Sequence, residues 1–89
     1  MMLSDREKDV ILTCARKYGV TELYLFGSTL KTDDYRDIDL GVKGISPALF
    51  FRFYGELLRK LSRPVDVVDL AQRTPFTALV EKEGVKLYG

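Results

Sequence analysis

Hydrophobic and polar positions along this chain switch several times between a helical and a strand pattern. Near the N-terminus, Ser4 and Glu7 have the spacing of a capping box, in which each side chain bonds to the backbone of the other residue. Apolar residues then recur on one helical face to about Lys17, and Gly19 follows as a stop signal. We therefore predict a first helix that ends near Lys17.

Two strands are predicted next. Residues 21–26 (TELYLF) form a β-branched and aromatic run that ends at Gly27, and residues 36–43 (RDIDLGVK) alternate polar and apolar side chains with a period of two. The segment between them is polar and short. Its first half is compatible with a stub of helix that begins at Ser28.

The second half of the chain repeats this rhythm. A Ser-Pro start signal precedes a helical spacing of apolar residues, which predicts a long helix over residues 46–61. A strand pattern with two inward-pointing valines follows at 64–70 (PVDVVDL). A Thr-Pro start and a closing glycine predict a last helix over 74–84, and 85–88 (VKLY) can add a short final strand.

The predicted order is helix, strand, short helix, strand, helix, strand, helix, strand. Such a succession is typical of an α/β or α+β fold with a small sheet flanked by helices. A chain of 89 residues has room for one modest core, and we find no linker or internal repeat. A single domain over residues 1–89 is therefore expected.

Composition narrows the possible chemistry. The chain has no histidine and a single cysteine, Cys14, so imidazole-dependent catalysis, imidazole zinc sites and an internal disulfide are excluded. Carboxylates, hydroxyls, Lys and Arg remain. The net charge of +1 gives no general attraction to nucleic acid or to anionic membranes, so no direct DNA binding is expected. The N-terminus has neither a signal peptide pattern nor a membrane span, and we expect a cytoplasmic protein without membrane association.

Three aspartates carry the candidate chemistry. Asp37 and Asp39 are two residues apart in a predicted strand, so both side chains leave the same face. Asp66 lies between two valines of the next predicted strand and reaches the same point if the strands are adjacent, about 5 Å apart. Carboxylate oxygens suit Mg²⁺, which keeps water and substrate phosphates in its other positions. The pattern favours a site for two such cations.

Gly27 and Ser28 add a candidate phosphate site at the end of the first strand. A glycine allows a phosphate to approach the backbone because no Cβ stands in the way. The serine hydroxyl and the amides that open a following helical turn can donate hydrogen bonds to phosphate oxygens. Strand, tight turn and helix start together suit a triphosphate.

Each feature also has a simpler interpretation. The Gly-Ser pair is compatible with an ordinary turn, and Asp37 and Asp39 with the solvated face of an edge strand. Asp66 is compatible with a surface pair with Arg63, and Asp69 is better explained as a strand-end or turn residue. The occurrence of all these elements in order within one small α/β unit favours the functional interpretation.

The surrounding sequence resembles the minimal nucleotidyltransferases, small prokaryotic members of the DNA polymerase β-like nucleotidyltransferase superfamily. The matching segments are LYLFGSTLKTDDYRDIDLGV, RPVDVVDL and LVEKEGVKLY, which cover nearly the whole chain from Thr21 onward. The resemblance implies the nucleotidyltransferase fold, with a small mixed β-sheet flanked by helices. It also implies transfer of a nucleoside monophosphate, expected to be AMP from ATP, to an acceptor hydroxyl with release of pyrophosphate.

The resemblance also implies roles for individual residues. Asp37 and Asp39 would hold Mg²⁺, in a site for two metal ions, and Asp66 would share the catalytic ion and help to deprotonate the acceptor. Gly27 and Ser28 would hold the β- and γ-phosphates of the ATP substrate. No protein nucleophile is required in this scheme.

Members of this family often act as antitoxins of a HEPN-type (higher eukaryotes and prokaryotes nucleotide-binding) ribonuclease toxin and adenylylate a tyrosine of it. A partner of that class is therefore expected. The alternative is a non-catalytic antitoxin or nucleotide-binding module that acts by protein–protein binding. Two departures from the family pattern bear on this alternative. Only eight residues separate Ser28 from Asp37. In addition, many relatives have an arginine soon after the serine, where this chain has Thr29, Leu30 and Lys31.

The long predicted helix carries more apolar residues than one buried face needs. We expect one set to cover the sheet, which leaves Phe51, Tyr54 and Leu58 as a second stripe. An exposed aromatic and leucine stripe on so small a domain would mark an interface. The alternative is that the last helix and the chain ends cover this stripe.

Overall fold

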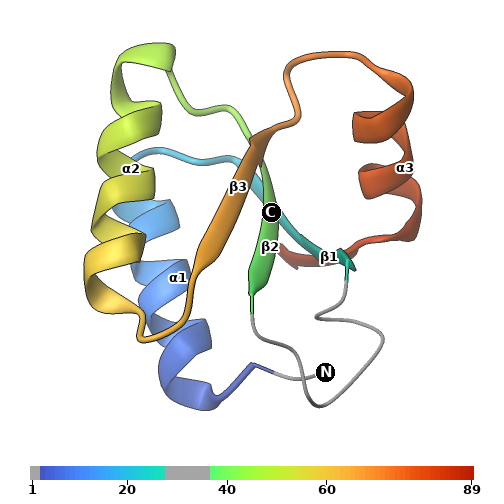
Figure 1. Cartoon of the computed structure of the whole chain (residues 1–89). Coiled ribbons are helices and arrows are strands. Elements are labelled where there is room, and N and C mark those ends of the chain that lie inside the picture. The colour runs from blue at the N-terminus through green and yellow to red at the C-terminus, as the bar shows by residue number, and fades with distance from the viewer. Residues whose placement is uncertain (1–2, 28–36) are drawn as a thin grey trace.

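The computed structural model describes residues 3–27 and 37–89. Within these ranges the chain forms a sheet with the strand order β3-β2-β1-β4, together with helices on both of its faces (Figure 1). The elements in chain order are α1 (Asp5–Lys17), β1 (Glu22–Phe26), β2 (Ile38–Lys43), α2 (Pro47–Lys60), β3 (Val65–Asp69), α3 (Pro75–Glu83) and β4 (Val85–Tyr88). The predicted helices and strands that fall on described residues are confirmed.

The sheet is mixed. β1 pairs antiparallel with β2 on one side and with β4 on the other, whereas β2 and β3 run parallel. Parallel neighbours need a long crossover connection, and α2 provides it between β2 and β3. The α/β fold class and the mixed sheet expected from the sequence are therefore confirmed.

The two faces of the sheet are covered differently. α1 and α2 lie on one side and α3 on the other (Figure 1). The main core lies under α1 and α2, where alternate residues of the central strands are buried, such as Ile38, Leu40 and Val42. A smaller cluster of Tyr24 and Val80 with Leu70 lies under α3.

Glycine allows α3 to approach the second face closely. A Cβ built on Gly41 in β2 would lie 3.0 Å from side-chain carbons of both Leu70 and Val80. Because side chains alternate along a strand, Asp39 faces the same side as Gly41, and Asp66 the same side as Val68. The face that α3 covers in part is therefore also the face of the candidate carboxylates.

All three helix starts agree with the sequence, and two of them are capped by side-chain hydrogen bonds. Ser4 and Glu7 form the predicted capping box, with N···O distances of 3.0 and 3.1 Å, and Thr74 caps α3 through Thr77. Ser46 precedes α2, but its side chain makes no capping hydrogen bond, and Pro47 alone marks that start. The predicted stub of helix at Ser28 lies outside the described residues.

The start of the second strand was predicted two residues too early. The alternating pattern placed the start of the second strand at residue 36, whereas β2 begins at Ile38, whose N–H bonds to the carbonyl of Pro64. Asp37 therefore lies just before the strand, in a bend. Pairing with β3 begins at Ile38 opposite Val65, and this sets the boundary.

Glu56 on α2 is a buried carboxylate whose burial the sequence pattern did not indicate. Only 4% of it is exposed, and it accepts hydrogen bonds of 2.8 Å from Lys17, Tyr18 and Lys60. The Cys14 thiol lies 3.5 Å away, and burial raises the pKa of this thiol. The buried charge is compensated by two ammonium groups, so it links α1 to α2 through polar contacts.

We expect Glu56 to make folding sensitive to acid. The bonds from Lys17, Lys60 and Tyr18 hold the pKa of this carboxyl well below its usual range. Its contribution to stability is therefore complete above about pH 4.3, the ordinary glutamate value, and is lost as the pH falls from there toward the folded pKa. Urea unfolding of Glu56→Gln should show a lower free energy of unfolding at pH 7 and a weaker loss between pH 5 and pH 3.

Glu81→Gln is the matched control, because Glu81 pairs with Lys43 at a half-exposed site. Surface ion pairs contribute about 0 to 1 kcal/mol, so this variant should keep the wild-type pH dependence. An equal acid sensitivity in wild type and Glu56→Gln would contradict the assignment.

No helix among residues 3–27 and 37–89 is long and apolar enough to cross a membrane.

Candidate functional site

Asp39 and Asp66 lie side by side on neighbouring strands. They are register partners in the parallel pairing of β2 with β3, and Phe26 of β1 is the register partner of Asp39 on the other side. Residues in register on adjacent strands point to the same face, about 4.8 Å apart in the direction of the hydrogen bonds. The structure thus forms a row across the sheet of Phe26, Asp39 and Asp66, which we call the carboxylate row.

Gly27 lies directly against this row. It follows β1 with φ +73°, a left-handed backbone conformation that favours glycine. A Cβ built at this position would overlap the carboxylate of Asp39 and would lie 3.2 Å from its Cγ. Backbone conformation and space therefore both require glycine next to the acidic side chain.

The other predicted site residues are not gathered in the same way. Asp37 is exposed and precedes Asp39 by two residues, outside the strand. Ser28 lies outside the described residues. Within residues 3–27 and 37–89, no three Asp, Glu or Cys side chains come close enough together to hold a metal ion. The structure therefore places Asp39 in register with Asp66 and against Gly27, whereas Asp37 lies before the strand.

Asp66 is exposed at the outer strand and receives a contact from α2. The hydroxyl of Tyr54 donates to Oδ1 of Asp66 at 3.4 Å. Burial raises the pKa of Tyr54, and the negative charge of Asp66 adds to this effect, so the phenol stays protonated and can donate. The sequence did not indicate this contact, because it depends on how α2 crosses from β2 to β3.

Two observations bear on the simpler interpretations of Asp66 and Asp69. Arg63, considered as a surface partner of Asp66, forms an ion pair with Glu7 of α1 at 2.9 Å. Asp69 accepts a hydrogen bond of 2.9 Å from the N–H of Ala71, so it is the turn residue that the sequence predicted.

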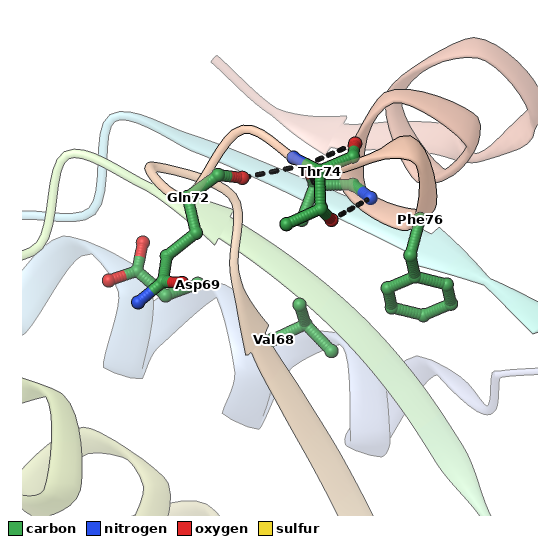
Figure 2. A pocket seen from close by; sticks show the side chains of 6 residues that line it. Val68, Asp69, Gln72, Thr74 and Phe76 are labelled. Carbon is green, nitrogen blue, oxygen red and sulfur yellow. Dashed lines mark hydrogen bonds between the residues drawn. The ribbon is translucent and has the colours of Figure 1, made fainter.

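A cavity of about 260 Å³ lies beside the carboxylate row, between β3 and α3. Its walls come from the end of β3, from the following loop and from the first turn of α3 (Figure 2). The lining residues are Val68, Asp69, Gln72, Thr74, Phe76 and Thr77. Nothing in the sequence pattern alone indicated this cavity.

The residues present fit a hard divalent cation in part. Asp39 and Asp66 offer carboxylate oxygens from adjacent strands, the ligands that Mg²⁺ prefers. Mg²⁺ is commonly held by one or two carboxylates together with substrate phosphates, so two aspartates beside a glycine turn suffice for such a group.

The expected second stripe of α2 is exposed at two of its three positions. Phe51 is 78% exposed and Leu58 is 50% exposed. Tyr54 is half-buried, packs against the main core and contacts Asp66, so its assignment to the exposed stripe was wrong. α3 lies on the other face of the sheet and does not cover these residues.

The sequence was compared with models of protein families and with curated proteins. The profile of the family described as "Polymerase beta, Nucleotidyltransferase" matches residues 8–89. No curated protein matches the chain significantly in sequence.

Several solved structures share the fold. A chain in the crystal structure of a toxin–antitoxin complex with AMP-PNP has 24% identity and a TM-score of 0.76, over 92% of this chain and 73% of that one. A chain of the MntA–HepT toxin–antitoxin complex has 22% identity and a TM-score of 0.73, over 97% and 73%.

A third similar chain comes from the tri-AMPylated Shewanella oneidensis HEPN toxin in complex with its MNT antitoxin. It has 24% identity and a TM-score of 0.71, over 93% of this chain and 70% of that one. Because the family profile spans nearly all of the sequence, including the strands that carry Asp39 and Asp66, the chain belongs to the polymerase beta nucleotidyltransferase family.

Proposed function

We propose that this protein transfers AMP from ATP to a hydroxyl group of a HEPN-type toxin and thereby acts as its antitoxin. The observation that carries the proposal is the carboxylate row: Asp39 and Asp66 in register on parallel strands, with Gly27 packed against Asp39. The solved neighbours, which include an antitoxin complex with AMP-PNP and a complex with an AMPylated toxin, support the choice of nucleotide and acceptor.

In this proposal Asp37, Asp39 and Asp66 hold Mg²⁺, and Gly27 and Ser28 hold the β- and γ-phosphates. When bound, the cations neutralise charge on the triphosphate and on the leaving pyrophosphate. Asp37 is the least constrained of the three aspartates, because it lies before β2 and is exposed.

The reaction exchanges one phosphoryl bond for another. The acceptor oxygen forms a bond to the α-phosphorus, and the bond from that phosphorus to the oxygen bridging to the β-phosphate breaks, so pyrophosphate leaves. The acceptor proton passes to the carboxylate of Asp66. The hydroxyl of Tyr54 donates a hydrogen bond to Oδ1 of Asp66 at 3.4 Å and so helps to orient this carboxylate. Positioning and electrostatic stabilisation supply the acceleration, without a covalent enzyme intermediate.

The test uses ATP labelled at one phosphate at a time. The protein is incubated with Mg²⁺, with the HEPN-type protein encoded next to it, and with ATP carrying ³²P at either the α- or the γ-position. Transfer of AMP labels the partner from α-labelled ATP only, and the γ-label appears in pyrophosphate. Label from the γ-position would indicate a kinase, and no label from either would contradict the proposal.

A second candidate function is neutralisation of the toxin by binding alone. It is favoured by Phe51 and Leu58, which are exposed one above the other on α2, seven residues apart and beside Arg52 and Arg59. Such an apolar pair flanked by cations suits a partner surface with an apolar centre and acidic rim. This surface lies on the opposite face of the sheet from the carboxylate row, so variants can separate the two functions.

Phe51→Asp and Leu58→Asp are expected to weaken toxin binding at least about ten-fold, because each places a charge in the apolar centre of the contact. Binding is measured by calorimetry with the purified toxin. Ala78→Asp is the control, since Ala78 is exposed on α3, which lies on the other face of the sheet. Unchanged affinity in the first two variants would exclude this surface as the toxin contact.

A further inference from the structure

The cavity between β3 and α3 lies beside the carboxylate row, two residues further along β3. Val68, which forms its floor, follows Asp66 by two residues and shares its face. Phe76, which forms one wall, makes an edge-to-face contact with Phe26 at 5.8 Å between ring centroids. Phe26 is itself the register partner of Asp39. The cavity therefore lies next to the proposed phosphate site, to which it is linked by Val68 of β3 and by the contact of Phe76 with Phe26 of β1.

The step along the strand matches the dimensions of a nucleotide. Two residues of a strand span about 6.6 Å, which is the scale of the ribose that separates an α-phosphate from its base. The volume of about 260 Å³ is below the roughly 300 Å³ at which pockets for drug-sized ligands begin. It suits a single flat ring system better than a complete nucleotide.

The walls of the cavity offer the surfaces that a nucleobase needs. Phe76 is 51% exposed, and its edge-to-face contact with Phe26 leaves part of the ring open to the cavity. Figure 2 shows this ring on one side, Gln72 on the other and Val68 between them. An aromatic face and an aliphatic floor can hold a base by stacking and apolar contact.

Hydrogen bonds hold the loop that forms the polar rim of the cavity. Thr77 donates a hydrogen bond of 2.6 Å to the carbonyl of Gln72, and Thr74 accepts one of 3.1 Å from the N–H of Thr77. Asp69 accepts from Ala71 at the start of the same loop. These bonds hold the backbone of the loop, so the amide of Gln72 is presented on a fixed support. A glutamine amide can pair with the N6 and N7 edge of adenine, donating to one and accepting from the other.

We infer that this cavity binds the adenine base of ATP, with Phe76 stacking on the ring and Gln72 recognising its edge. The inference rests on the proposed function for the identity of the nucleotide and deepens it by assigning a base site. In this inference Asp69 is not a cation ligand; its side chain stabilises the turn by accepting the hydrogen bond from Ala71.

The test compares ATP with ribose 5-triphosphate, which has the same phosphates and sugar but no base. Calorimetry in Mg²⁺ is expected to show about ten-fold tighter binding of ATP to the wild type. Phe76→Ala should remove this preference by weakening ATP alone, and Phe76→Tyr should restore it. Gln72→Leu should lower the preference for ATP over GTP while ribose 5-triphosphate binding stays the same.

Phe51→Ala is the matched control, because it removes an exposed phenylalanine from the opposite face of the molecule. Equal binding of ATP and ribose 5-triphosphate to the wild type, or parallel weakening of both ligands in Phe76→Ala, would overturn the inference. Transfer activity takes no part in this measurement. A protein that prefers ATP through Phe76 but labels no acceptor would retain the base site and contradict only the proposed function.

Discussion

Asp39→Asn is expected to lower AMP transfer by about 100- to 1,000-fold. The change keeps the shape of the side chain and removes its charge at the centre of the carboxylate row, where Asp66 and Gly27 are its neighbours. Loss of one preorganised electrostatic group at a reaction centre has effects of this order. The rate is measured as release of pyrophosphate and as labelling of the acceptor, with the thermal unfolding midpoint followed in parallel to confirm folding.

Asp9→Asn provides the control for this change. Asp9 is exposed on α1, on the opposite side of the sheet, and the substitution makes the same chemical change there. Its rate of transfer should equal that of the wild type. Full activity in Asp39→Asn would show that the ligands of the cation have been assigned wrongly.

Gly27→Ala is expected to abolish most of the transfer activity as well, for a steric reason. The new Cβ would overlap the carboxylate of Asp39 and displace it from the row. The alanine must also adopt a left-handed backbone conformation, which costs about 1 to 2 kcal/mol of folding free energy. We expect at least a ten-fold lower transfer rate at saturating ATP, together with a measurable loss of stability in urea unfolding.

Gly19→Ala separates these two effects. Gly19 has φ +74°, almost the same as Gly27, but a Cβ at this position has no atom within 4 Å. It should therefore lose a similar amount of stability and keep its transfer activity. If the two alanine variants lost activity equally, the contact between Gly27 and Asp39 would have no special role.

Much of the fold could be predicted because local signals agreed with the final packing. The capping box at Ser4, the Thr-Pro start before α3 and the alternation of valines and aspartates in β3 each correspond to the observed elements. The exposure of Phe51 and Leu58 also followed from helical spacing. These features depend on neighbours within a few residues, which a single sequence displays directly.

The remaining features depend on contacts between distant segments. Glu56 is charged and lies at a position of α2 that faces α1, so its burial depends on cations supplied by another helix. The contact of Tyr54 with Asp66 and the cavity beside Phe76 likewise arise from how helices cross the sheet. Periodicity identifies the buried face of a helix but not the partner of each side chain.

The site itself was predicted in part. That Asp39 and Asp66 would be adjacent followed from the expectation that their strands are neighbours, and the parallel register confirms this adjacency. The position of Asp37 differed, since β2 begins one residue after it. The roles of these aspartates and of Gly27 and Ser28 remain proposals that the variants above test.

Binding of Mn²⁺ with AMP-PNP, followed by NMR of the ¹⁵N-labelled protein, tests the location of the chemistry most directly. Mn²⁺ broadens amide signals near it, and we predict that Gly27, Asp39 and Asp66 lose intensity first, before any residue of α1. Asp39→Asn should weaken this effect, and Asp9→Asn should not. Broadening that begins at α1, or that spreads evenly over the chain, would contradict a nucleotide site on the carboxylate row.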